Sequence, residues 1–430
     1  MTRTTAVRTR TPAALSRRLA ALLAAAALTA AGCAAEGGTA AAADAGVTED
    51  ALIVGGLLVE TSTIGYSLAD METGALARFE RANAEGGVHG RTIDYTGTQD
   101  DRLDPEESLA GARALAEKEQ VLAAVPVASP AFNGADVFTD NGIPWFGWGT
   151  HQAFCRNDHG FGFNGCLQPE QGDRTQTWWG ELMAEELGGA EGKTAWVQST
   201  DSASSAAGMG PMAASFAAAG FEVIGQDAGI PADAAPADWT PYVNAVLGAD
   251  GGDPPDVVVS VMTSGHNAGL YGALKRAGFE GAWTDGVSYD PDILAQPELA
   301  EALDGAYGSP QVQPFELAEE HPEVALMQED LRSHTGDPDL EFSQPMAYGY
   351  WSADLFLAAA EAAGPDITRA SLTETLNSGF THEDPGFGTT EYPAGHRESN
   401  GCGALVRLED GEFTPVQELT CTENTVYQGD

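Results

Sequence analysis

The sequence predicts an α/β fold built from two doubly wound parallel sheets, and three observations support it. Apolar runs rich in β-branched residues alternate with stretches of helical spacing along most of the chain, as expected for strand–helix units of parallel sheets. The alternation breaks between residues 151 and 172, where Gly, Phe and two Cys gather. A chain of 430 residues is also long enough for two globular domains. We therefore expect two clusters of strand–helix units.

The clearest strand–helix unit begins with the β-branched run 257–261, which suits a strand buried on both faces. Leu270 and Leu274 recur at helical spacing, and Gly278 suits the position just past a helix end. Thr263 belongs to the short polar loop between strand and helix. Parallel sheets bind ligands at the carboxyl ends of their strands, so this loop is a candidate binding element.

The other elements follow the same two periodicities. Asp104 and Pro105, followed by two Glu, predict a helix start, because they supply a cap, a first-turn proline and acids near the positive helix end. In the first cluster we expect strands 52–59, 92–96, 121–127 and 143–148, with helices 68–82, 104–120 and 130–141. In the second we expect helix 173–187, strand 194–198, helix 204–219, strand 221–225, a helix from 240, and strand 282–286.

The N-terminus has the features of an export signal, predicted over residues 1–33. Residues 1–32 contain five Arg and no acid, and the apolar run 19–28 is shorter than the roughly 20 residues of a membrane span. Ala30-Ala31-Gly32-Cys33 resembles a bacterial lipobox, whose Cys receives a lipid, although Leu is usual where Ala30 stands. Ordinary signal cleavage is the alternative. The Ala- and Gly-rich residues 34–46 suit a flexible tether.

Charge and cysteine content narrow the function classes. The net charge of −44 argues against binding to nucleic acid or anionic lipid, and we interpret it as a solubilising surface. Beyond Cys33, four cysteines remain, which predicts two disulfides in an oxidising compartment. Three pairings are possible, and we favour the local pairs. The absence of a CxxC motif argues against zinc. The four residues are Cys155, Cys166, Cys402 and Cys421.

Taken together, several motifs resemble the type I periplasmic (solute-binding) proteins of ABC transporters, in the branched-chain amino-acid (leucine-binding) branch. The likeness covers residues 47–416. It implies two lobes joined by three hinge crossings, which close on a ligand. Lobe 1 is expected to comprise residues 47–165 with 310–382, and lobe 2 residues 172–309 with 383–430. The motifs are Asn83-Ala-Glu-Gly-Gly-Val-His-Gly-Arg91, Asp100-Asp101 before Asp104-Pro105, Asn141-Gly-Ile-Pro144, and the hairpin turn Asp410-Gly411.

The resemblance assigns a ligand site between the lobes. Ser129, with Gly149 and Thr150, matches the groups that receive an amino-acid carboxylate, because hydroxyls and backbone N–H groups suit an anion. Asp285 matches the acid that pairs with the ligand ammonium, although Glu is common there. Tyr66 matches a tyrosine of the first loop.

The loops of lobe 2 depart further from the family pattern. Ser202 and its neighbours replace the usual Tyr-Gly pair, and Thr263 lies in the next loop. Structural roles remain alternatives: Ser129 and Thr150 as caps after strands, and Asp285 as a turn residue. We also expect one of two alternating tryptophans to face the cleft and the other to be core. They are Trp145 and Trp148.

These features predict a lipid-anchored extracytoplasmic receptor that delivers an amino acid or related small polar solute to an ABC permease, with no cofactor or metal. One alternative is a sensor subunit that reports its ligand to a membrane kinase. An extracellular hydrolase is a further alternative, since spacing alone does not exclude a catalytic triad. The near-match to a phosphate loop ending at Gly192-Lys193-Thr194 precedes a strand instead of following one, which argues against nucleotide binding.

Overall fold

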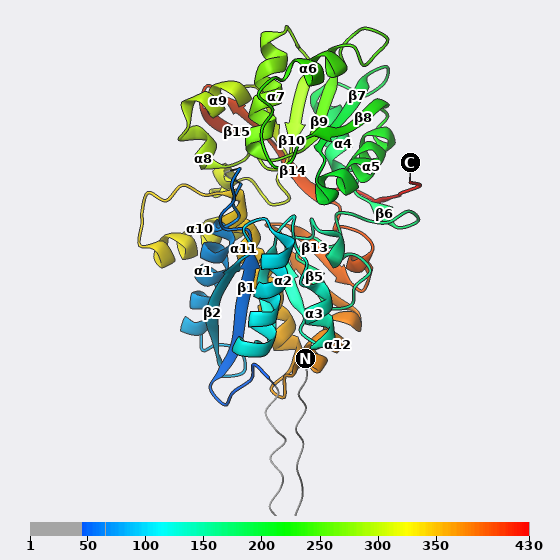
Figure 1. The fold of residues 1–430 in the computed structure, drawn as a ribbon. Coiled ribbons are helices and arrows are strands. Elements are labelled where there is room, and N and C mark those ends of the chain that lie inside the picture. Colours follow the sequence, from blue (N-terminus) through cyan, green and yellow to red (C-terminus); the bar gives the residue numbers. More distant parts are fainter. Residues whose placement is uncertain (1–44, 65, 430) are drawn as a thin grey trace, which may run out of the picture. The chain divides into compact units, whose positions relative to one another are not determined.

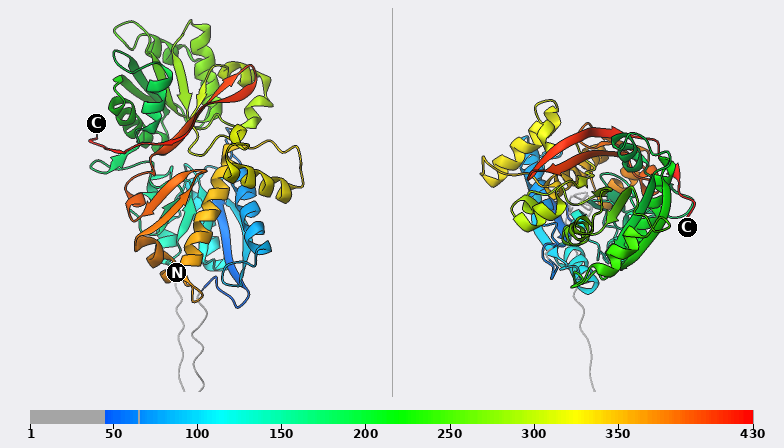
Figure 2. Two further views of the ribbon diagram at one scale, coloured as in Figure 1. Left: turned by 180° about the vertical axis from the view of Figure 1, so that it is seen from behind. Right: turned by 90° about the horizontal axis from the view of Figure 1, so that it is seen from above.

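The computed structural model describes residues 45–64 and 66–429. These residues form two sheet-based lobes (Figure 1, Figure 2). The chain passes between the two sheets three times: after β5 (Gly160–Gly162), after β11 (Tyr307–Gly308) and before β14 (Cys402–Glu409). The predicted fold class, two doubly wound lobes joined by three crossings, is therefore confirmed.

Lobe 1 has a five-stranded parallel sheet in the order β2-β1-β3-β4-β5. Helices α1 and α11 pack against each other on one face, and α2 and α3 pack on the opposite face, which gives the lobe two separate apolar cores. The remaining strands are β1 (Ala51–Leu58), β2 (Thr92–Asp100), β3 (Ala123–Ala128) and β4 (Trp145–Gly147). The helices are α1 (Asp70–Ala84), α2 (Pro105–Arg113), α3 (Ala135–Asp140), α10 (Pro322–Thr335), α11 (Gln344–Ala363) and α12 (Arg369–Asn377).

The start of α2 follows from its sequence. Asp104 accepts hydrogen bonds from the backbone N–H groups of Glu106 (2.7 Å) and Glu107 (3.1 Å), as the capping prediction requires. A π-helical segment, Ala114–Glu119, continues α2, and Gln120 ends it with a φ of 52°. The predicted helix end near Gln120 is thus confirmed.

Lobe 2 has a seven-stranded sheet in the order β15-β14-β11-β10-β9-β7-β8. Its β14 runs antiparallel to both β11 and β15, and the predicted hairpin at Asp410-Gly411 forms this antiparallel edge of an otherwise parallel sheet. The other strands are β7 (Thr194–Thr200), β8 (Glu222–Ile230), β9 (Val257–Val261), β10 (Ala282–Asp285) and β15 (Glu412–Cys421). The helices are α4 (Trp178–Glu186), α5 (Ala203–Ala218), α6 (Thr240–Leu247), α7 (Ser264–Arg276), α8 (Pro291–Leu294) and α9 (Pro297–Leu303).

Both local disulfide pairings are present. Cys155 bonds Cys166, and Cys402 bonds Cys421. The second pair follows from hairpin register, because Cys402 lies opposite Cys421 across β14 and β15. The hairpin turns at Asp410-Gly411, where both residues have positive φ.

One detail of the first crossing differs from the sequence prediction. Asp173 does not cap a helix: residues 174–175 form the short strand β6 (Arg174–Thr175), and α4 begins only at Trp178. The carboxylate of Asp173 instead pairs with Arg156, with N–O distances of 2.7 and 2.9 Å. Paired with β16 (Thr425–Val426), β6 ties the first crossing to the C-terminal segment.

The hairpin of β12 (Phe380–Asp384) and β13 (Gly388–Tyr392) packs on lobe 1. The Tyr392 hydroxyl donates to the carbonyl of Gly162 at 2.7 Å, and Thr390 donates to the carbonyl of Phe163. The expected lobe boundary between residues 382 and 383 divides this hairpin, so it lies too early in the chain.

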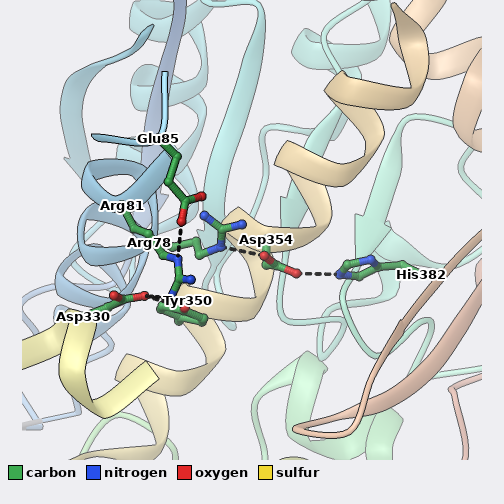
Figure 3. A network of polar contacts seen from close by, with 7 residues as sticks. All are labelled: Arg78, Arg81, Glu85, Asp330, Tyr350, Asp354 and His382. Atoms are coloured by element: carbon green, nitrogen blue, oxygen red, sulfur yellow. Dashed lines mark hydrogen bonds and ion pairs between the residues drawn. The ribbon is translucent and has the colours of Figure 1, made fainter. Parts of the chain in front are cut away.

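A polar network joins the helices on one face of lobe 1 (Figure 3). Arg78 on α1 lies 2.6 Å from Asp354 on α11, whose other oxygen lies 3.0 Å from His382 on β12. Asp330 on α10 accepts hydrogen bonds from Arg81 on α1 (3.3 Å) and from Tyr350 on α11 (2.7 Å). We call these residues, with Glu85, the lobe 1 network.

Candidate functional site

Two adjoining cavities lie where the carboxyl ends of strands from both lobes meet. None of the residues lining the first, about 160 Å³, is charged, so we call it the neutral chamber. The second, about 340 Å³, is lined by Asp290 and Asp292, and we call it the acidic chamber. Within the described part of the chain, no Lys, Arg or His side chain lines either chamber. The residues shared by both are Tyr66, Trp148, Thr263 and Val287.

Aromatic rings form part of the neutral chamber, and hydrogen bonds fix their orientation. Trp148 follows β4, its indole N–H donates to Oε1 of Gln311 at 2.8 Å, and its ring centroid lies 4.7 Å from that of Tyr348. Trp179 on α4 donates from its indole N–H to Oγ1 of Thr284 at 2.7 Å. Of the two alternating tryptophans, Trp148 lines the cleft, whereas Trp145 is fully buried in the core.

Two glutamines give the neutral chamber a complementary donor and acceptor. Gln168 donates from Nε2 to the carbonyl of Ser204 (2.9 Å), while its buried Oε1 has no hydrogen-bond partner among the described residues. Oε1 of Gln311 accepts from both Trp148 and Asn164, which leaves its NH₂ group as the end available to a ligand. An amide group could pair with both ends at once, whereas an ionised carboxylate, which only accepts, could pair only with the NH₂ group of Gln311. The other polar residues of the lining are Tyr66, Thr150, Gln176, Ser204, Ser205, Ser260, Thr263 and Ser309.

Three of the seven predicted ligand-binding residues line these chambers: Tyr66, Thr150 and Thr263. Tyr66 follows β1, and burial is the main cause that raises the pKa of its phenol, so it stays neutral. The Thr263 hydroxyl lies 2.7 Å from Nδ1 of His266, whose Nε2 lies 3.0 Å from the carbonyl of Pro231. His266 therefore orients a cavity hydroxyl without lining the cavity itself.

Three predicted residues lie just behind the cavity wall. Ser129 is 2% exposed, and its Oγ accepts from the backbone N–H of Ala131, while the adjacent Pro130 lines the chamber. The backbone N–H of Gly149 is already used by the side chain of Asn164 at 3.1 Å. Ser202 caps α5 by accepting from the N–H of Ser205. Ser202 is therefore a helix cap, whereas Ser129 closes a turn after β3 and does not cap α3, which begins after Gly134.

Asp285 does not line either chamber, which corrects its expected role toward a ligand ammonium. Its carboxylate is fully buried and accepts from the backbone N–H groups of Val287 (3.0 Å) and Ser288 (2.7 Å). It also accepts from the Ser288 hydroxyl and from the indole N–H of Trp283. The turn-residue alternative describes this geometry, and only the adjacent Gly286 reaches the neutral chamber.

The acidic chamber was not foreseen from the sequence. Asp290 and Asp292 lie at the start of α8, and Gln344 and Tyr348 lie on the first turns of α11. Burial raises the pKa of Asp290 to about 6, with further contributions from the charges of Asp292 and Asp70. The sequence offered one signal: Asp290-Pro291 predicts a helix start that follows soon after a strand end.

The remaining predictions concern the N-terminal signal, metal sites and membrane spans. Cys33, the signal peptide 1–33 and most of the tether lie outside the described residues. Among the described residues, no group of three or more His, Cys, Asp or Glu side chains could hold a metal ion. None of the described helices has the length and apolarity required to cross a membrane.

Comparisons with known proteins match this architecture. A family model described as "Periplasmic binding protein" matches residues 51–412. No curated protein matches the chain. A possible leucine/isoleucine/valine-binding protein from Rhodopirellula baltica is similar in structure, with a TM-score of 0.67, 18% identity, and coverage of 88% of this chain and 98% of that one.

Two further solved structures share the fold. One is a branched-chain amino-acid transporter substrate-binding protein from Streptococcus pneumoniae in complex with isoleucine, with a TM-score of 0.66, 16% identity, and coverage of 86% and 99% of the two chains. The other is an ABC transporter solute-binding protein from R. palustris in complex with 4-hydroxybenzoate, with a TM-score of 0.65, 16% identity, and coverage of 86% and 97%. The family match covers most of the sequence, so this chain belongs to the periplasmic binding protein family, whose members bind solutes and are not enzymes.

Proposed function

We propose that the protein is the extracytoplasmic substrate-binding component of an ABC importer, held at the membrane by a lipid on Cys33. Its ligand is an amino acid or a related small polar solute, and its protein partner is the importer's permease. The observation that carries this proposal is the neutral chamber, an uncharged cavity lined from both lobes by hydrogen-bonding side chains. Burial between two lobes suits a receptor that captures and releases a solute by hinge motion.

The polar lining supports an amide or carboxyl group on the ligand. Oε1 of Gln168, which has no donor among the described residues, offers an acceptor on the wall of the neutral chamber, and the NH₂ group of Gln311, whose Oε1 is already used, offers a donor. Trp148 and Trp179 add flat apolar surface beside this pair. Similar folds are solved with isoleucine and with 4-hydroxybenzoate, so the fold leaves the ligand open and the lining residues support the choice.

One hydrogen bond already spans the cleft. Nε2 of Gln344, on α11 of lobe 1, donates to the carbonyl of Gly286, after β10 of lobe 2, at 2.8 Å. A ligand that bridges the lobes adds contacts to the same closed arrangement, and it therefore shifts the population toward closure.

A thermal-shift screen of amino acids, amides and aromatic acids tests the binding role. We expect at least one compound to raise the unfolding temperature and to bind with a dissociation constant near micromolar, about −8 kcal/mol. Gln168→Ala should then weaken binding about fivefold, since one hydrogen bond contributes about 1 kcal/mol. Gln152→Ala, an exposed glutamine, is the matched control.

A screen without any stabilising solute would contradict the proposal, as would equal affinities for the two glutamine variants. The lipid anchor has its own test. Mass spectrometry of the membrane-bound protein should show a diacylglycerol-modified N-terminal Cys33, and an unmodified N-terminus further along the chain would remove the anchor.

A further inference from the structure

The acidic chamber holds hydrogen-bond acceptors that the protein leaves without cationic partners. Asp290 accepts one hydrogen bond, from the backbone N–H of Asp292, and among the described residues neither carboxylate forms an ion pair. Asp70, at the start of α1 in lobe 1, contributes a third carboxylate nearby, hydrogen-bonded by the Ser343 hydroxyl at 2.6 Å. Negative charge from both lobes therefore meets at this chamber, although like charges repel in a partly buried setting.

The pKa values of Asp70 and Asp290 reflect the charges of neighbouring carboxylates. Burial is the main cause that raises the pKa of Asp70, and the charge of Asp292 adds to it. Asp290 is affected in the same way by both other acids. An arrangement that makes carboxylates harder to ionise is a cost to the empty protein, and a bound cation would relieve that cost.

Gln344 provides a second, independent indication of a ligand. It lines the acidic chamber and is only 2% exposed. Its NH₂ group is used by the carbonyl of Gly286 and the hydroxyl of Tyr348, but its Oε1 accepts no hydrogen bond from the described residues. Buried acceptors without donors are uncommon in folded proteins, so this oxygen also calls for a donor from outside the chain.

We propose that the acidic chamber binds an ammonium group of the transported solute, with Asp290, Asp292 and Gln344 as its acceptors. The rest of the solute then lies past Tyr66 and Trp148, in the neutral chamber. This inference rests on the proposed function, and it assigns the binding of the ligand ammonium to Asp290 and Asp292 instead of Asp285. A metal ion is a poor alternative, because no described cluster has the ligands to hold one.

The test compares three probes that share a phenylethyl body and differ in charge: phenethylamine, 2-phenylethanol and 3-phenylpropionate. We expect isothermal titration calorimetry of the full chain at pH 7.5 to show the amine binding at least tenfold more tightly than either other probe. The double variant Asp290→Asn with Asp292→Asn should lose at least tenfold in affinity for the amine. Asn also caps helices well, so α8 should remain formed.

Glu298→Gln, an exposed acid on the adjacent helix α9, is the matched control and should bind the amine as the natural protein does. Tighter binding of the alcohol or the carboxylate, or equal amine affinity in the double variant, would overturn the inference while leaving a solute-binding role intact. Failure of all three probes, with a neutral or anionic ligand emerging from the wider screen, would also overturn it. Only the absence of every ligand would count against the proposed function itself.

Discussion

The carboxylates of the lobe 1 network and those of the acidic chamber have opposite surroundings. Asp354 lies between Arg78 (2.6 Å) and His382 (3.0 Å), so its charge is matched by groups on neighbouring elements (Figure 3). Asp290 and Asp292 have acids for neighbours and no cation among the described residues. Asp354 and Asp290 are both partly buried, whereas Asp292 is exposed, so burial alone does not explain why Asp354 and Asp290 differ.

The pKa values of the two groups move in opposite directions. Burial opposes ionisation of Asp354, but its contacts with His382 and Arg78 outweigh burial and hold its pKa below the usual value. At Asp290, burial and two nearby acids raise the pKa to about 6. The charge of Asp354 is thus paired within the chain. The charge of Asp290 in the acidic chamber would be paired by a cation from solution.

The largest change in stability should follow from removing the charge of Asp354, the carboxylate that is paired within the chain. Asp354→Asn removes the charge that Arg78 and His382 share, and leaves a buried guanidinium facing an amide. We expect the free energy of unfolding to fall by about 3 kcal/mol, measured by urea denaturation. The exposed pair Lys118–Glu119 provides the control, since Glu119→Gln should cost less than about 0.5 kcal/mol. Equal losses of unfolding free energy in the two variants would mean that the lobe 1 network stabilises the fold no more than a surface ion pair does.

Asp285 is an intermediate case in this comparison, because it is a buried carboxylate that accepts four hydrogen bonds but forms no ion pair with any residue that the structure describes. Asp285→Asn keeps an acceptor for the backbone N–H groups but turns an NH₂ group toward Trp283. We expect a loss of about 2 kcal/mol in unfolding free energy and less than a threefold change in ligand affinity. Asp290→Asn should instead cause no loss of unfolding free energy and a larger loss of ligand affinity. A large affinity loss in Asp285→Asn would restore its predicted role in ligand binding.

Strand, helix and hairpin patterns in the sequence were sufficient to predict the fold. The buried run 257–261 and the cap at Asp104 form the expected strand and helix start, and the hairpin at Asp410-Gly411 brings Cys402 opposite Cys421. The antiparallel pairing of β14 with β11 was not predicted, because periodicity reports burial and not strand direction.

The site was predicted only in part, for a physical reason. Loop position brings Tyr66, Thr150 and Thr263 to the cavity, because strand ends converge there. The direction in which a side chain points depends on its local hydrogen bonds, and these turn Asp285 into its own loop. Gln168 and Gln311 come from crossing segments without periodicity, so no pattern marked them.

The smallest expected change is in the pH dependence of stability, and it tests whether Asp290 lacks a charged partner. Asp290 has a folded-state pKa of about 6, above its value in an unfolded chain, so the folded protein holds this proton more tightly. That contribution to stability is present below the unfolded-state pKa and is lost as pH rises through about 6. Without ligand, Asp290→Asn should therefore stabilise the protein by about 1 kcal/mol at pH 7.5 and by almost nothing at pH 4, once the partial exposure of the side chain is taken into account.

Thermal unfolding at the two pH values measures this difference, and Asp354→Asn should instead remain destabilised at pH 7.5, where its carboxylate is ionised in the natural protein. If Asp290→Asn were equally stable relative to the natural protein at both pH values, Asp290 would have no unmet charge and the contrast between the two regions would disappear.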